Sequence, residues 1–186
     1  MKHAHKIHVL LLAIAGVFAA AASHARLAAP GDSRVAFHAI GPSGLKIDGT
    51  TNELGVNEAS EQVSVVVPLR GLDTKIELRN KHMRDNYLET DKYPTAELVV
   101  ARSALKTPDA APVSGEADGI MKLHGREHAV RFKYDASRLE RAGARYQVNG
   151  SVRLDIRDYG IKEPSFMGAS VKPEVEVVVS FTVSEQ

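Results

Sequence analysis

The 186-residue sequence contains no cysteine and no tryptophan, and aromatic residues make up only 5% of it. Without cysteine, the chain can neither form a disulfide nor carry a lipid on a cysteine side chain. Its fold must therefore rest on a buried apolar core. Because large rings are scarce, that core must be built mainly from smaller aliphatic side chains.

No charge of either sign dominates the sequence. Lys and Arg together number 24 and Asp and Glu 23, which gives a formal net charge of +1. This balance argues against nucleic acid, and against an anionic membrane surface, as a partner.

Long apolar runs are also missing, except in the first 25 residues, which have the pattern of a secretory signal peptide. Two lysines precede the apolar run Val9–Ala22, and Ser23 and Ala25 lie at the −3 and −1 positions of a cleavage site after Ala25. The run is too short for a comfortable membrane span. We therefore predict removal of residues 1–25, export to the periplasm and no stable membrane anchor. A retained N-terminal anchor is the alternative.

Residues 26–186 have the length of one domain and show no internal repeat or linker. Alternation of apolar and polar residues predicts strands in this part, separated by Gly, Pro and Asn. Gly49 suggests a β-bulge in the second of them. The predicted strands cover residues 33–38, 45–54, 61–69, 95–101, 118–125, 128–136, 144–156 and 170–183.

One short helix is predicted between the third and fourth strands. Residues 74–77 have the form of a capping box, a Thr followed three positions later by a Glu. Ile76, Met83 and Tyr87 then fall near one helical face, and Pro94 ends any helix.

Eight antiparallel strands with hairpin-length connections predict a closed barrel or a two-sheet sandwich. A closed barrel has no exposed sheet edges, and an eight-stranded lumen is either filled by side chains or open to one slender ligand. The valine-rich inward faces favour an open lumen. Candidate lumen and rim residues for ligand binding are Phe37, Val65, Val67, Leu98, Val100, Phe132, Tyr134, Tyr146, Val148, Tyr159, Phe166, Met167 and Phe181.

The connection before the last strand is unusually apolar. Tyr159, Ile161, Phe166 and Met167 occur there among glycines and prolines. We expect this segment to fold over one end of the barrel, where it would either touch a ligand or plug the core permanently.

Four segments resemble the YceI-like family in their order and spacing. They are "DSRVAF" (32–37), "RDNYLETDKYPTAEL" (84–98), "GIMKLHGREHAVRFKY" (119–134) and "DYGI" (158–161). The resemblance implies an exported, eight-stranded, lipocalin-like barrel with one short helix, of a kind associated with polyisoprenoid lipids. The chain departs from the family pattern in its first strand, which lacks a His-Ser pair, and at Thr51 and Leu54, which replace aromatic residues.

These features predict non-enzymatic binding, carriage or storage of a polyisoprenoid-type or other long-chain lipid in the lumen, with no cofactor and no metal. Arg84 and Asp85 are expected to form a structural ion pair, with contact between Arg84 and a lipid headgroup as the alternative. Other readings of the whole chain are a sealed barrel with a stress-related or partner-binding role, and an isomerase or cyclase of apolar substrates. The sequence does not predict an oligomeric state.

Overall fold

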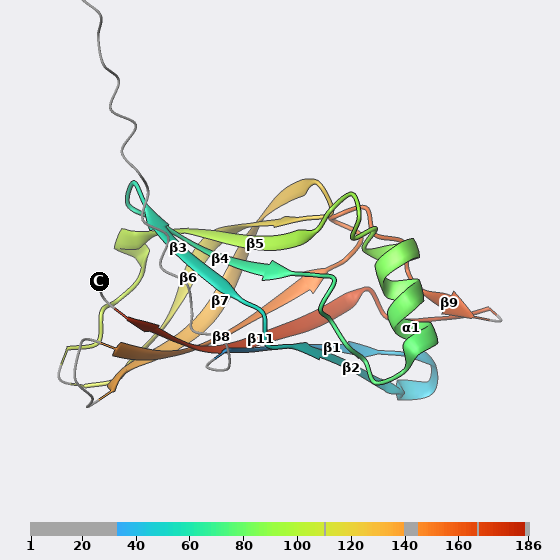
Figure 1. The fold of residues 1–186 in the computed structure, drawn as a ribbon, viewed down its shortest axis with the longest axis horizontal. Helices are drawn as coiled ribbons and strands as arrows, with labels where there is room; N and C mark the ends of the chain where they lie inside the picture. Colours follow the sequence, from blue (N-terminus) through green and yellow to red (C-terminus); the bar gives the residue numbers. More distant parts are fainter. Residues whose placement is uncertain (1–32, 110, 140–144, 167, 185–186) are drawn as a thin grey trace, which may run out of the picture.

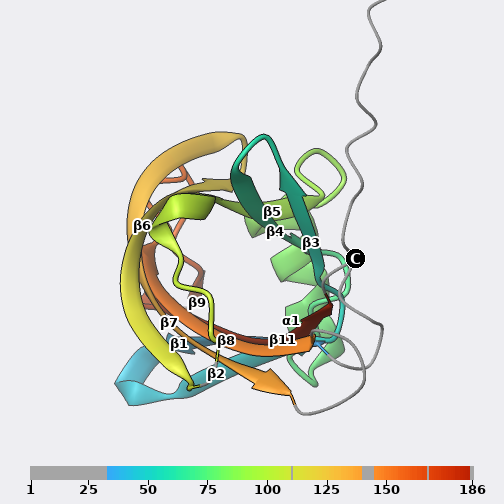
Figure 2. The same cartoon turned by 90° about the vertical axis from the view of Figure 1, so that its left-hand side faces the viewer.

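The computed structural model describes residues 33–109, 111–139, 145–166 and 168–184. Nine antiparallel strands form one sheet in the order β2-β1-β11-β8-β7-β6-β5-β4-β3, and this sheet curls around a central axis (Figures 1 and 2). The strands are β1 (Ser33–Ile40), β2 (Lys46–Thr51), β3 (Gly55–Ala59), β4 (Gln62–Pro68), β5 (Thr95–Ala101), β6 (Val113–Leu123), β7 (Arg126–Leu139), β8 (Arg145–Asp155) and β11 (Glu174–Ser184).

The two edges of this sheet are joined by consecutive chain. β2 pairs with β1 along one edge, β3 pairs with β4 along the other, and only residues 52–54 separate them. A single bent stretch therefore connects both edges and completes a lipocalin-like barrel. This arrangement confirms the predicted fold class, although the strand count of eight is wrong.

The missing strand is β3, and the reason lies in its sequence. Its segment, "GVNEA", holds one large apolar residue, Val56, so it shows little alternation. Its extended shape comes from the ladder with β4, in which Val56 lies opposite Val65. A separate two-stranded ribbon, β9 (Ser165–Phe166) with β10 (Ala169–Ser170), lies in the connection before β11 and was also not predicted.

Gly49 does not form the bulge that we expected. The β1–β2 register is continuous through Phe37 opposite Gly49. A Cβ on Gly49 would lie 2.6 Å from Cζ of Phe37, so the glycine is needed because the ring covers it.

The helix is α1 (Glu77–His82), which continues as a π-helical turn through Met83–Tyr87. The predicted capping box is wrong, because the residue before the helix is Ile76 and no side chain caps it. Thr74 is buried instead, and its hydroxyl and backbone N–H both donate to Oδ1 of Asn80, at 2.6 and 2.8 Å.

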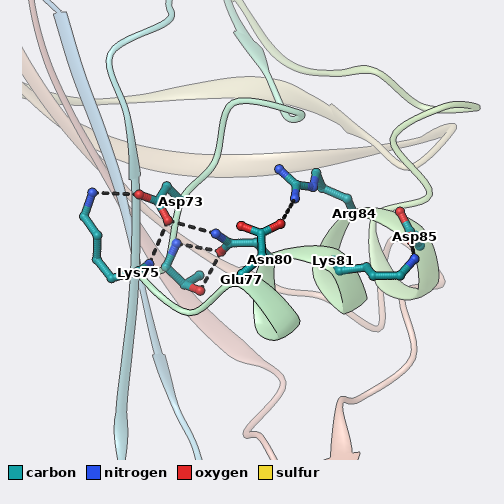
Figure 3. Close-up of polar contacts among 8 residues, drawn as sticks. Asp73, Lys75, Glu77, Asn80, Lys81, Arg84 and Asp85 are labelled. Carbon is teal, nitrogen blue, oxygen red and sulfur yellow. Dashed lines mark hydrogen bonds and ion pairs between the residues drawn. The ribbon is translucent and has the colours of Figure 1, made fainter.

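The expected Arg84–Asp85 pair is also wrong. Arg84 donates to Oε1 of Glu77 at 3.1 Å, and Lys81 donates to Oδ2 of Asp85 at 2.6 Å (Figure 3). Both interactions join residues on the exposed side of the helix, so Arg84 does have a structural role with a different partner.

The helix lies at one end of the barrel, together with the 3₁₀ turn Pro42–Gly44 and the β9–β10 ribbon (Figure 1). We call this end the helix end. The β3–β4 hairpin and the segment that follows β5 lie at the other end (Figure 1). Within the described ranges, no helix is long and apolar enough to cross a membrane.

Candidate functional site

A cavity of about 900 Å³ occupies the barrel interior. All nine strands of the large sheet contribute to its lining, as do the helix and the connection before β11. This volume lies within the ~300–1,000 Å³ that small-molecule sites usually enclose.

Strand alternation explains why the cavity is apolar. Successive side chains on a strand point to opposite faces, so Val63, Val65 and Val67 of β4 all point inward. The inward residues of β11 follow the same rule. Because valine is short, these walls do not meet across the axis, and the inward valines of β4 are only partly buried.

The larger rings line this space without filling it. Phe132 and Tyr134, neighbouring inward residues of β7, have ring centroids 6.0 Å apart and are both buried. The Tyr134 hydroxyl accepts a hydrogen bond of 2.9 Å from the backbone N–H of Lys106. The Tyr134 ring is thus held against the wall, and the cavity remains beside both rings.

Ten of the thirteen candidate residues from the sequence line the cavity. They are Phe37, Val65, Val67, Leu98, Val100, Phe132, Tyr134, Tyr146, Val148 and Phe181. Whether they contact a ligand stays a prediction.

The other three candidates belong to the connection before β11. Tyr159 does not line the cavity; only 1% of its surface is exposed, and its ring packs edge-on against His128 with centroids 5.2 Å apart. Burial raises the pKa of Tyr159 to about 12. Phe166 lies in β9, but its side chain is outside the described residues, as is Met167.

Part of the same connection does reach the lumen. Ile161 is 4% exposed and lines the cavity, as do Pro164 and Val171. The apolar segment therefore closes one side of the helix end, with Tyr159 anchoring it in the core and Ile161 facing the hollow.

Sequence reasoning missed the contribution of the helix and of the turn before it. Leu69, Leu72, Met83, Tyr87 and Leu88 all line the cavity. The spacing of Met83 and Tyr87 indicated an apolar helical face, but no local signal showed that this face covers a lumen.

The end opposite the helix is bordered by polar side chains. Arg102 lies 3.3 Å from Oε1 of Glu58 and donates to the Thr107 hydroxyl at 2.6 Å. Glu58, Arg102, Lys106 and Thr107 all line the cavity. The cavity lining at this mouth therefore includes ion-paired and hydrogen-bonded side chains, in contrast to the apolar lining between the strands.

At the helix end, a small polar network fixes the turn before the helix. Asn80, which is 5% exposed, donates to Asp73 at 2.8 Å, while Lys75 donates to the same carboxylate from its backbone and its ammonium, each at 2.7 Å (Figure 3). These hydrogen bonds, from Lys75 above all, hold the pKa of Asp73 well below its ordinary value. The turn therefore positions the lumen-facing Leu72 and Thr74.

Two further polar residues of the helix, Arg79 and His82, line the cavity at this mouth. Arg79 donates to the carbonyl of Thr74 at 2.7 Å, and its Nε is buried without a hydrogen-bond partner. Across the described ranges, no three His, Cys, Asp or Glu side chains gather closely enough to hold a metal ion.

A family model described as the YceI-like domain matches residues 27–183. Among curated proteins, a UPF0312 protein of Vibrio cholerae is 29% identical over 138 residues, which cover 72% of this chain and 69% of that protein. The match therefore extends over most of both chains.

Solved structures with similar folds include two from other bacteria. A polyisoprenoid binding domain from Saccharophagus degradans, implicated in plant cell wall breakdown, aligns with a TM-score of 0.70 at 17% identity, over 87% of this chain and 98% of that one. BcnA of Burkholderia cenocepacia aligns with a TM-score of 0.64 at 12% identity, over 83% and 98%. At these identities, the likeness supports the barrel fold alone.

Proposed function

This chain belongs to the YceI-like family, and from that premise we propose that it binds a long apolar lipid of polyisoprenoid type inside its barrel, without catalysing a reaction. One observation carries the proposal: the barrel holds a cavity of about 900 Å³ whose walls are largely apolar and to which all nine strands contribute. The choice of a polyisoprenoid among apolar lipids follows the name of one protein with the same fold, a polyisoprenoid binding domain, and is part of the proposal.

The shape of the barrel suits a slender chain. β11 has 11 residues, which at about 3.3 Å per residue extend over roughly 36 Å. Strands in such barrels tilt by about 40°, which leaves an axial length of roughly 28 Å. An extended prenyl chain of comparable length matches such an axis.

Desolvation supplies the driving force. Burying a methylene-sized group contributes about 0.8 kcal/mol, so a prenyl tail with many such groups is strongly favoured in an apolar hollow over water. Lost motion of lipid and protein reduces the net affinity well below that sum.

The distribution of polar groups favours binding over catalysis. Charged side chains that line the cavity, such as Arg79, Glu58 and Arg102, come from the helix or from segments at the opposite mouth. An isomerase or cyclase would need such groups beside the reacting carbons in the aliphatic middle of the lumen.

We also propose that the protein acts in the periplasm after residues 1–25 are removed. The apolar run followed by small residues at the cleavage positions supports this location. An apolar lipid cannot diffuse freely in an aqueous compartment, so a hollow carrier or store would be useful there. Fractionation of the producing cells and N-terminal sequencing would test the location and the cleavage site.

Binding can be tested with a series of prenylquinones that differ only in chain length. Native mass spectrometry should show a one-to-one complex, and affinity should rise with each isoprene unit until the chain fills the lumen. A protein that forms no complex, or whose affinity ignores chain length, would refute the proposal.

A further inference from the structure

Exposed apolar side chains gather at one mouth of the barrel. Leu45, Ile76 and Leu78 expose 59%, 51% and 62% of their surface, and each also lines the cavity. The only other large apolar side chain with comparable exposure among the described residues is Ile120, which lies within β6. We call Leu45, Ile76 and Leu78 the apolar rim.

The apolar rim is assembled from two separate parts of the chain. Leu45 follows the 3₁₀ turn Pro42–Gly44, whereas Ile76 and Leu78 lie at the start of the helix; both parts are at the helix end (Figure 1). Backbone hydrogen bonds of 3.0 and 2.9 Å between Thr50 and Asp73 tie the segment before the helix to β2. The fold therefore places these three side chains at the helix end, where they line the cavity and are exposed to water.

Three lysines without an ion-pair partner accompany the apolar rim. Lys46, Lys162 and Lys172 are exposed and form no ion pair within the described part of the chain. Lys46 lies opposite Ile40 in the β1–β2 ladder, and the backbone N–H of Lys172 donates to the Ile40 carbonyl at 2.7 Å, so these two lysines flank the strand end beside Leu45.

The third lysine and the nearby acids complete this charge pattern. Lys162 directly follows the lumen-facing Ile161. Glu77 and Glu163 are already engaged, by Arg84 and Arg157 respectively. Asp158 and Glu174 are also exposed and without an ion pair in the described part of the chain, so they offset two of the three lysine charges and leave an excess of one positive charge among these unpaired groups.

We propose that the helix end docks transiently on a bilayer that contains anionic lipids, with the apolar rim inserted at the acyl boundary and the three lysines at the headgroups. Aliphatic side chains beside lysines are the combination that binds such interfaces. In solution, the apolar rim has no cover within the described residues. Among the described residues of the opposite mouth, no large apolar side chain has comparable exposure, and Arg102 is paired with Glu58.

Docking would give a lipid a route into the lumen. This route rests on the proposed function, but the docking itself does not depend on it. Because the rim residues are both exposed and part of the cavity lining, an apolar chain that entered past them would pass from the bilayer into the barrel without crossing water. The near-neutral net charge argued against an anionic membrane as a partner. Net charge is a sum over the whole molecule, however, and does not show that three unpaired lysines lie at the same end as the apolar rim.

The test is flotation of the protein with vesicles of phosphatidylglycerol and phosphatidylethanolamine. Three forms are compared: the unmodified chain, the triple variant Lys46→Gln, Lys162→Gln and Lys172→Gln, and a charge-matched triple variant. The charge-matched control carries Lys122→Gln, Arg131→Gln and Lys133→Gln. These three residues lie on the barrel wall in β6 and β7. The N-terminus of each preparation is read by mass spectrometry, since an uncleaved Val9–Ala22 would bind vesicles by itself.

Each lysine should contribute about fivefold to binding, so the rim triple variant should bind on the order of 100-fold more weakly, while the control triple variant binds like the unmodified chain. Equal loss in both triple variants, or no vesicle binding by any form, would overturn the proposal. Photo-crosslinking from position 78 to a membrane protein, without vesicle binding, would assign this rim to a protein partner and overturn it as well.

A second readout separates this inference from the proposed function. Loading of a prenylquinone from detergent measures the lumen alone, and loading from vesicles measures lumen and docking together. The rim lysines do not line the cavity, so their triple variant should load normally from detergent but slowly from vesicles. If the rim triple variant and the unmodified chain load from vesicles at equal rates, docking is refuted and the proposed lumen site is unaffected. If the unmodified chain fails to load from detergent, the proposed function is refuted.

Discussion

The most informative perturbation narrows the lumen from two sides. Val65 of β4 and Val148 of β8 both line the cavity, and three strands separate β4 from β8 in one direction around the sheet and four in the other. They therefore lie on opposite walls. The double variant Val65→Phe, Val148→Phe would place two rings across the hollow, with each ring adding about four carbon atoms.

These rings should displace several ligand groups at about 0.8 kcal/mol each. A slender chain can shift past them in part, so we expect a loss of about 3 kcal/mol, or roughly 100-fold in affinity for a long-chain prenylquinone. Fluorescence titration in detergent would measure the affinity of both proteins for the prenylquinone, and native mass spectrometry would give the stoichiometry.

Stability gives the matched control. Phenylalanine forced into a packed core costs about 1–3 kcal/mol, but a ring that extends from a partly buried valine into the cavity displaces fewer packed atoms. The double variant should therefore keep its Tm within about 3 °C. Ala117→Leu, which enlarges a buried residue that does not line the cavity, should lower the Tm by about 2–12 °C. Undiminished lipid binding by the double variant, or an equal loss of stability in both proteins, would refute an open lumen as the site.

Three further changes test particular contacts. Gly49→Ala should destabilise the fold by about 1–3 kcal/mol in urea titrations, because its Cβ would collide with Phe37; Phe37→Leu in the same chain should restore part of the loss. Asn80→Ala should cost about 2–3 kcal/mol and lower the Tm by about 4–12 °C, because it leaves buried donors unpaired; an unchanged Tm would contradict the network. The Asp73 carboxylate has a lowered pKa, chiefly through Lys75, so its contribution is complete above about pH 4 and is lost as the pH falls further. In Asp73→Asn, the unfolding free energy should therefore fall less steeply between about pH 4 and 2 than in the unmodified chain. Identical slopes in the two proteins would argue against a stabilising role of the Asp73 carboxylate.

The strands that could be predicted are those whose sequence carries its own pattern. In β4, alternating valines indicated both the strand and its inward face, and Val63, Val65 and Val67 all line the lumen. β3 has no such pattern, since its shape comes from pairing with β4. Local propensity cannot reveal an element that distant backbone hydrogen bonds create.

The site divides in the same way. Inward strand residues such as Phe132 could be predicted because strand period fixes their direction. Leu72 and Met83 could not, because their role depends on where the helix packs, and Thr74 looked like a cap although its hydroxyl turns toward Asn80. Tyr159 had the composition of a rim residue but lies in the core beside His128.

The central claim is that the barrel holds an isoprenoid chain in its hollow. A crystal structure of the protein after incubation with a long-chain prenylquinone tests it most directly. Our account predicts continuous, elongated density along the barrel axis between Val65 and Val148, within van der Waals distance of the inward valines. A lumen closed by its own side chains, or one that contains only ordered water, would contradict it.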